Sequence, residues 1–118
     1  MKEKFGVQLY SVREEIKTKG FPAMLKVIKE AGYDCVEFAG FYDYSPEEVA
    51  ELLKENGLTG ISAHIGIDAI EAQLPYIDKI GIKYVYIPWR TYEELCGDKM
   101  TEFIEKIKHV KKLLDQRG

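Results

Sequence analysis

The sequence predicts an α/β fold in which four parallel βα units form half of a (β/α)8 barrel. Gly32, Gly57 and Gly81 each end a helical pattern and precede a strand-like segment, at spacings of 25 and 24 residues. Such a period fits one strand, one short helix and their loops. The expected strands also alternate between an apolar and a polar face, which favours helices on one side only, as in a barrel. A flavodoxin-like open sheet, with helices on both sides, is the alternative.

Strands and helices are expected to alternate along the whole chain. The four expected strands span about residues 5–11, 35–40, 60–65 and 84–89. Helices follow them where apolar residues recur at helical spacing, within residues 21–32, 45–57, 68–81 and 101–118. Alternating units of this size indicate parallel strands joined by right-handed crossovers.

Several helix starts carry their own signals. The segment 45–48 reads Ser-Pro-Glu-Glu, which is the order of an N-cap, a first-turn proline and a capping-box glutamate. Asp68 repeats that capping spacing with Glu71. Pro75 is expected either to kink the third helix or to shift its start. Residues 91–94 are expected to form a short extra turn before the last helix.

The two faces of the expected strands differ in chemistry. The apolar face carries Val7, Leu9, Val36, Phe38, Ile61, Ala63, Val85 and Ile87. The polar face carries Gln8, Tyr10, Cys35, Glu37, Ser62, His64, Tyr84 and Tyr86. Because no helix would cover the polar face well, we expect it to line the inside of a curved sheet, where groups near the carboxyl ends of the strands are free to act chemically.

Composition and charge indicate the number of domains, the excluded partners and the expected location of the protein. The 118 residues are 46% hydrophobic and 31% charged, which predicts one globular domain over residues 1–118. The net charge of −3 argues against a nucleic-acid partner. The chain shows neither a membrane-length apolar run nor a signal peptide, so a cytoplasmic location without membrane contact is expected. Cys35 and Cys96 are expected to be free thiols.

Four segments carry a family resemblance: GVQLYSVREE, FPAMLKVIKEAGYDCVEFAGFYDYSPEEVAELLKENGL, ISAHIG and KYVYIPW. In this order and spacing they resemble the N-terminal half of the sugar phosphate isomerase/epimerase family, the xylose isomerase-like TIM barrels. The resemblance implies aldose–ketose isomerisation or ketose epimerisation of a small sugar or sugar phosphate by the complete enzyme. The same barrel occurs in ketose 3-epimerases, inositol-catabolic enzymes and type IV endonucleases, so it implies a fold more firmly than a substrate.

The resemblance also implies roles for residues at the strand ends. Glu37 matches the acidic residue of the VEF segment, and His64 matches the histidine of the SAH segment. Both are candidate catalytic residues, and His64 is also a possible metal ligand; a purely structural role for each is the alternative. Aromatic rings can stack on a sugar face while their polar tips bind hydroxyl groups. The candidate substrate-binding residues are Gln8, Tyr10, Tyr86 and Trp89.

The resemblance further implies a divalent metal, Mn, Mg, Co or Zn, in the complete family enzymes. Its ligands are carboxylates and a histidine on the fifth to the eighth strand, which have no counterpart among the 118 residues. We therefore expect this chain alone to bind no such metal tightly, and the sequence leaves open whether it is an enzyme. A complete (β/α)8 barrel takes roughly 250 residues, about twice this length.

Two other functions stay open. Four barrel strands leave two open edges and an uncovered inner face, which favours self-association or pairing with a complementary half-barrel. In that interpretation the chain is a non-catalytic scaffold or binding module, and dimerisation closes an eight-stranded barrel. The other alternative is a fragment of an endonuclease IV-like barrel, which the acidic net charge disfavours.

Overall fold

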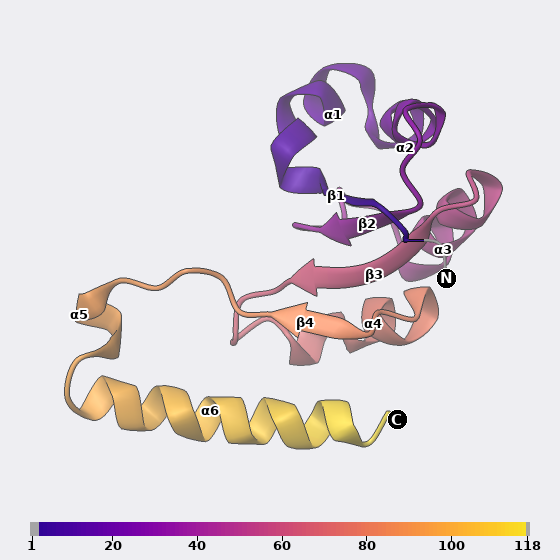
Figure 1. The fold of residues 1–118 in the computed structure, drawn as a ribbon. Helices are drawn as coiled ribbons and strands as arrows, with labels where there is room; N and C mark the ends of the chain where they lie inside the picture. Colours follow the sequence, from indigo (N-terminus) through magenta and orange to yellow (C-terminus); the bar gives the residue numbers. More distant parts are fainter. Residues whose placement is uncertain (1–2, 118) are drawn as a thin grey trace.

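The protein forms a single sheet of four parallel strands joined by helices (Figure 1). The structure is a computed structural model that describes residues 3–117. The strands pair in the order β1-β2-β3-β4, and each neighbouring pair is parallel. This arrangement confirms the predicted four parallel βα units. The strands are β1 (Gly6–Gln8), β2 (Cys35–Phe38), β3 (Thr59–His64) and β4 (Tyr84–Tyr86).

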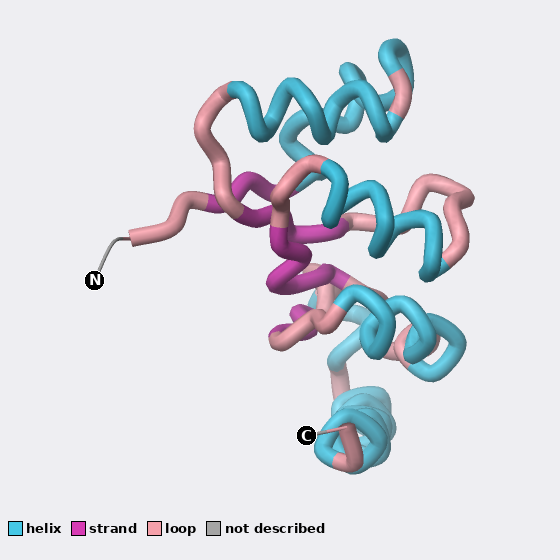
Figure 2. The backbone as a smooth tube through the Cα atoms, turned by 90° about the vertical axis from the view of Figure 1, so that its right-hand side faces the viewer, coloured by secondary structure: helices cyan, strands magenta, loops and turns pink. Residues whose placement is uncertain are grey.

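The helices form an arc around one side of the strands (Figure 2). The opposite face of the sheet is concave, and none of the helices between residues 3 and 117 covers it. An open doubly wound sheet would carry helices on both faces. The α-helices are α1 (Arg13–Lys19), α2 (Phe21–Glu30), α3 (Pro46–Glu55), α4 (Leu74–Ile80), α5 (Tyr92–Leu95) and α6 (Asp98–Asp115); η1 (Leu9–Val12) and η2 (Glu71–Gln73) are short 3₁₀ helices.

The hydrophobic core lies between the sheet and the helices. Val36 and Phe38 of β2 are fully buried there, as are Leu25 of α2 and Val49 of α3. Burial of each such side chain stabilises the fold by about 1.5–3 kcal/mol. The stability of the sheet therefore comes from its helix-covered face, which leaves the concave face free for polar residues.

The first unit differs from the prediction in two ways. β1 ends at Gln8 instead of residue 11, because η1 begins at Leu9, whose side chain is fully buried. Helix α1 was not predicted, since Ile16 is its one buried residue and no apolar stripe marks it. Gly20, with φ at 93°, separates α1 from α2 in a backbone conformation that glycine adopts most easily.

The structure contains the predicted capping box of α3 and the predicted glycines at the ends of three helices. Ser45 Oγ accepts a hydrogen bond from the Glu48 backbone N–H at 3.2 Å, and Glu48 Oε2 accepts one from the Ser45 N–H at 2.8 Å. This is the predicted capping box of α3. At the other helix ends, Gly32, Gly57 and Gly81 have φ values of 100°, 64° and 81°, as expected for glycines that end helices.

The third helix starts later than predicted. α4 begins at Leu74, so Pro75 occupies the first turn, where its missing N–H costs no hydrogen bond. Pro75 therefore shifts the start of the helix and does not kink it. The predicted capping role of Asp68 is wrong, because the helix begins six residues later and the Asp68 carboxylate pairs instead with Lys106 Nζ at 2.9 Å.

Strand β3 contains a β-bulge. Val36 of β2 pairs with Gly60, and the next residue, Glu37, pairs with Ser62, so that Ile61 is one extra residue on β3. An extra residue of this kind shifts the alternation of side chains along the strand. Ile61 is half-buried, and Gly60 before it faces the core side chains of Ile80 and Phe38, so the regular alternation that placed Ile61 on the helix-covered face does not hold at the bulge.

The last unit ends in the long helix α6, which lies beside β4 and α4 (Figure 1). Val110 is buried, and Phe103, Ile107 and Leu114 are partly buried against the core. The Lys106–Asp68 ion pair and a second pair, Arg117 Nε to Asp78 Oδ1 at 2.8 Å, join α6 to the third unit. None of the described helices is both long enough and apolar enough to cross a bilayer.

Candidate functional site

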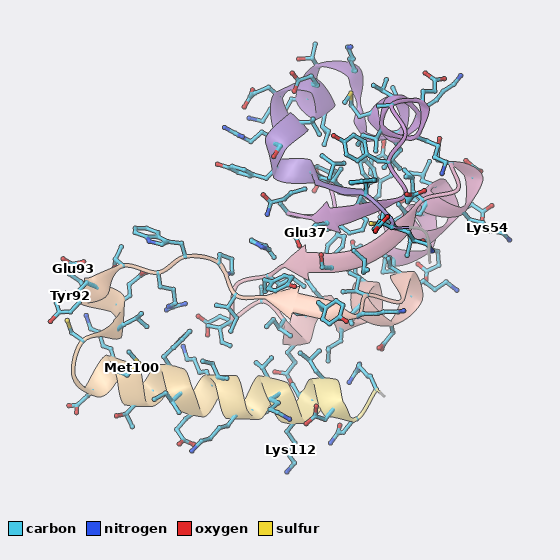
Figure 3. The ribbon with its side chains drawn as sticks, in the orientation of Figure 1. Glu37, Lys54, Tyr92, Glu93, Met100 and Lys112 are labelled. Atoms are coloured by element: carbon cyan, nitrogen blue, oxygen red, sulfur yellow. The ribbon has the colours of Figure 1, made fainter. Side chains whose placement is uncertain are left out.

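Polar side chains from three neighbouring strands meet on the concave face. Gln8 ends β1, Glu37 lies one residue before the end of β2, and His64 ends β3. The register pairs Gln8 with Glu37 and Glu37 with Ser62. Paired residues of parallel strands point to the same side of a sheet, so these side chains converge near the carboxyl ends of the strands. Figure 3 shows Glu37 at this place, between the ends of β2 and β3.

Glu37 is the centre of the hydrogen bonds in this cluster. Its Oε1 accepts a hydrogen bond from Gln8 Nε2 at 2.8 Å and lies 3.0 Å from His64 Nε2. Its Oε2 accepts a hydrogen bond from Ser62 Oγ at 2.5 Å. His64 must carry a proton on Nε2 to donate to the carboxylate, so its 3.5 Å approach to Gln8 Nε2 joins two donors and is a packing contact.

The cluster is accessible to solutes. The side chains of Glu37 and His64 are 23% and 36% exposed. Beside them lies an open hollow of about 230 Å³, whose lining residues include Gln8, Ile61 and Ser62. A half-buried carboxylate that already holds two neutral donors is well placed to exchange one of them for a ligand hydroxyl group.

Tyr86 adds an aromatic wall to the cluster. It is paired with His64 in the register of β3 and β4, and the two ring centroids are 5.6 Å apart. Tyr86 is 48% exposed, so much of its ring remains free to contact a ligand. The structure thus brings together Gln8, Glu37, His64 and Tyr86 of the predicted site residues.

Two predicted site residues lie beyond the strand ends. Tyr10 belongs to η1, is 55% exposed, and has the Arg13 guanidinium 4.1 Å from its ring centroid. Trp89 lies three residues after β4 and is 85% exposed. Their described contacts do not include the Glu37 cluster, because both strands end earlier than predicted. Their roles in substrate binding stay predictions.

Ser62 is a member of the cluster that sequence reasoning did not nominate. It is the one buried polar residue among those described, and its hydroxyl group donates to Glu37. Serine is common at strand positions of every kind, which is why its residue type alone did not single it out. Its position two residues before His64, on the same polar face, was the available signal.

The loop after β2 uses its aromatic residues for packing. The Tyr42 ring lies 4.8 Å from that of Phe21 in a stacked arrangement, and burial raises the pKa of the Tyr42 hydroxyl. Tyr44 is held by its backbone carbonyl, which accepts a hydrogen bond from Tyr76 Oη at 2.6 Å. Both tyrosines therefore join the loop to α2 and α4.

The described residues do not fit a divalent metal site. Glu37 and His64 offer two ligand groups, and no group of three or more His, Cys, Asp or Glu side chains is gathered anywhere in residues 3–117. Both Glu37 oxygens are already occupied by donors. Protein metal sites of this kind usually take at least three protein ligands. A metal bound to the complete barrel would need ligands from outside the described residues.

Solved structures of similar fold are about twice as long as this chain. No family model and no curated protein matches the sequence. Two sugar phosphate isomerase/epimerase structures from Parabacteroides distasonis match 93% and 92% of this chain, with TM-scores of 0.66 and 0.63 and identities of 19% and 20%. An AP endonuclease, family 2, from Brucella melitensis matches 99% of it, with a TM-score of 0.75 and 18% identity.

These matches extend over 48%, 51% and 53% of the three longer chains. Identities this low show a shared fold, while substrate and activity depend on the site. The match covers almost the whole of this chain, including the strand order and the arc of helices. The protein therefore has the fold of half a TIM barrel, and it spans about half the length of the structures it matches.

Proposed function

We propose that this chain is the N-terminal half of a sugar isomerase/epimerase-type barrel, and that its Glu37 cluster forms one wall of the substrate pocket. The single observation that carries the proposal is the Glu37 carboxylate, shared by Gln8, Ser62 and His64 at the carboxyl ends of three strands. Active sites of (β/α)8 barrels lie at this end of the strands. In this proposal the complete protein acts in the cytoplasm on a sugar or sugar phosphate.

The cluster has the chemistry to hold sugar hydroxyl groups. Glu37 accepts hydrogen bonds, Gln8 can both donate and accept, and His64 can donate from Nε2. A sugar hydroxyl that replaced Gln8 on Glu37 Oε1 would gain a charge-assisted hydrogen bond. The exposed ring of Tyr86 would contact the C–H groups of the same sugar.

The hydrogen-bonded pair of Glu37 and His64 also supports proton transfer. A carboxylate can take up a proton from a substrate carbon or hydroxyl group, and the neighbouring imidazole can donate a hydrogen bond to that carboxylate or give a proton back to the substrate. Removal of a proton from the carbon next to the carbonyl is the step that proton-transfer isomerisation and ketose epimerisation share; isomerisation then returns a proton to the adjacent carbon, and epimerisation returns one to the opposite face of the same carbon. In this proposal Glu37 and His64 are the catalytic residues.

A polynucleotide substrate of the endonuclease type is less well supported by this chain. Its net charge is −3, and the most central group of the site is a carboxylate. Nucleic-acid binding depends on cationic side chains that neutralise phosphates. The match to an AP endonuclease nevertheless makes DNA the necessary comparison in any binding experiment.

The two histidines of the chain provide the test, because His64 lies in the site and His109 lies on α6. Ring signals of ¹⁵N-labelled histidine would be followed while D-fructose, D-fructose 6-phosphate or a duplex containing an abasic site is added. We expect a saturable shift of the His64 signal with either sugar, at millimolar affinity, which corresponds to about −4 kcal/mol. The His109 signal should not move.

A pair of matched variants tests whether sugar binding depends on the Glu37 cluster or on another carboxylate of the surface. Glu37→Gln should weaken sugar binding about tenfold, as expected for the loss of one charge-assisted hydrogen bond. Glu71→Gln, which alters the carboxylate facing His109, should leave sugar binding unchanged. A His64 shift with abasic DNA alone would favour the endonuclease-type function, and equal effects of the two variants would contradict a pocket at Glu37.

A further inference from the structure

Exposed large apolar side chains are confined to the two outer units of the described chain. The inner units, residues 35–81, contribute none of them, whereas the first unit (residues 3–34) and the fourth (residues 82–117) contribute all. A single exposed apolar residue needs no explanation, but a grouping on two flanks marks an interaction surface. The exposed residues are Phe5, Tyr10, Val27, Tyr84, Tyr86, Trp89, Tyr92, Met100 and Ile104.

The backbone is open on the same two flanks. β1 and β4 are the outer strands of the sheet, and within residues 3–117 each is paired along one side only. Unpaired edges of this kind are templates for a further strand. Because β1 and β4 run in the same direction, β4 of one molecule can accept β1 of another as a parallel neighbour.

We propose that two copies of this chain associate through both flanks, β4 of each beside β1 of the other, to close an eight-stranded parallel barrel. The occupant is a second copy of the 118-residue chain because one copy supplies four of the eight strands of a TIM barrel and its two outer strands run in the same direction, so two copies supply all eight. In a longer chain of the length of the matched structures, the second half of that chain would take the same place. Twofold symmetry makes the two junctions identical, so that one favourable junction is used twice.

Helices α2 and α6 also lie where the proposed junction between two copies requires them. In a closed barrel the helix of the fourth unit packs beside the helix of the unit that follows, which here is the first unit of the second copy. Val27 on α2 is 43% exposed, and Met100 and Ile104 on α6 are 40% and 42% exposed. Contact between these helices would bury the apolar side chains that both flanks now leave in water.

The polar residues of the concave face are compatible with a closed barrel of two copies. Each Glu37 carboxylate is already satisfied by Gln8, Ser62 and His64 of its own chain, so that facing copies would not leave bare carboxylates in a shared lumen. The second copy would enclose the open hollow and cover Tyr84 and Tyr86, which are 56% and 48% exposed. This inference does not depend on which ligand the site binds.

Sedimentation velocity of the purified chain tests the association. We expect a dimer with a micromolar dissociation constant, and Ile104→Glu should raise that constant at least tenfold. Lys54→Gln changes the net charge by the same amount on α3, far from α6 in Figure 3, and should have no effect. A monomer at 100 µM would overturn the proposal and would indicate that another chain segment completes the barrel.

Cross-linking tests the geometry. In a Cys96→Ser background, Val27→Cys and Ile104→Cys chains would be mixed and treated with a bis-maleimide spanning about 10 Å, the usual distance between packed helices. The mixture should give cross-linked dimers, and each variant alone should give few. Efficient cross-linking of Ile104→Cys alone would overturn the proposed pairing, because α6 would then face α6.

Discussion

Glu37 Oε1 lies 3.0 Å from His64 Nε2 and, through the same oxygen, 2.8 Å from Gln8 Nε2. One carboxylate oxygen therefore joins side chains from β1, β2 and β3 on a face that no described helix covers. Such a group can contribute either to the stability of the sheet or to the affinity for a ligand, and the two contributions can be measured separately.

Replacing Glu37 by alanine tests its structural contribution. The change leaves Gln8, Ser62 and His64 without their acceptor, although water reaches this half-exposed place and compensates in part. We expect the free energy of unfolding to fall by about 1 kcal/mol, measured by urea denaturation followed by circular dichroism. Glu51→Ala on the exposed surface of α3 is the control and should change it by less than about 0.5 kcal/mol. A Glu37→Ala chain that is more stable than the original would show that the cluster is maintained for function.

Gly60 is a position where any side chain should be destabilising. A Cβ added there would lie 2.6 Å from Ile80 Cγ2 and 2.8 Å from Phe38 Cε2, both in the core. Gly60→Ala should therefore lower the free energy of unfolding by about 1–3 kcal/mol through overpacking. Gly66→Ala is the matched control, because a Cβ at Gly66 meets no atom within 4 Å. Equal unfolding midpoints for the two variants would contradict the close packing of β3 on α4.

The capping box of α3 should contribute more to the free energy of unfolding than that of α5. Ser45 and Thr91 make the same pair of backbone hydrogen bonds, but α3 buries Val49 and Leu53, whereas α5 buries none of its residues. Ser45→Ala should lower the free energy of unfolding by about 1 kcal/mol. Thr91→Ala should alter it much less, because α5 can unfold locally while the core remains intact. Thermal and urea unfolding of both variants would check this difference, and a larger loss for Thr91→Ala would contradict it.

The attachment of α6 should weaken in acid. The hydrogen bond from Lys106 and its positive charge hold the pKa of Asp68 below its usual value of 3.8. A lowered pKa in the folded state means that the ionised form stabilises the fold above the ordinary pKa, and that this contribution is lost as the pH falls through the lower value. Amide exchange at Ile107 and Val110 should therefore accelerate as the pH is lowered below about 4, after correction for intrinsic exchange rates.

Lys106→Met should reduce that pH dependence, because Asp68 loses the partner that lowers its pKa. Lys108→Met is the control: Lys108 pairs with Glu105 on the same helix and should not affect the attachment of α6. Identical pH profiles for Lys106→Met and the original chain would show that Asp68 does not hold α6.

Sequence periodicity was sufficient to predict the four parallel strands and the polar concave face. It placed Gln8, Glu37 and His64 together because side chains of neighbouring parallel strands align at their carboxyl ends. It could not locate the ends of β1 and β4, because strand ends depend on tertiary packing such as the burial of Leu9. For the same reason Tyr10 and Trp89 were assigned to the site although they lie beyond the strands.

The bulge in β3 was also missed, although one residue could have indicated it. An isolated glycine inside a strand often marks a bulge or a close approach of packed groups. Gly60 does both here, since it faces Ile80 and immediately precedes the extra residue Ile61. Helix α1 offered no comparable signal, because one buried isoleucine does not make a periodic pattern.

The extra residue in β3 also determines which side of the sheet His64 occupies. Before Ile61 the strand alternates in one phase, with Gly60 toward the helices; after it the phase is reversed, with Ser62 and His64 toward the concave face. If β3 kept Ile61 but ran past it in regular alternation, without a bulge, Ser62 and His64 would face the core and Ala63 would face solvent. Deletion of Ile61 would place Ser62 directly after Gly60 and remove the bulge, so Ser62 and His64 should keep their side of the sheet and the imidazole should stay beside Glu37.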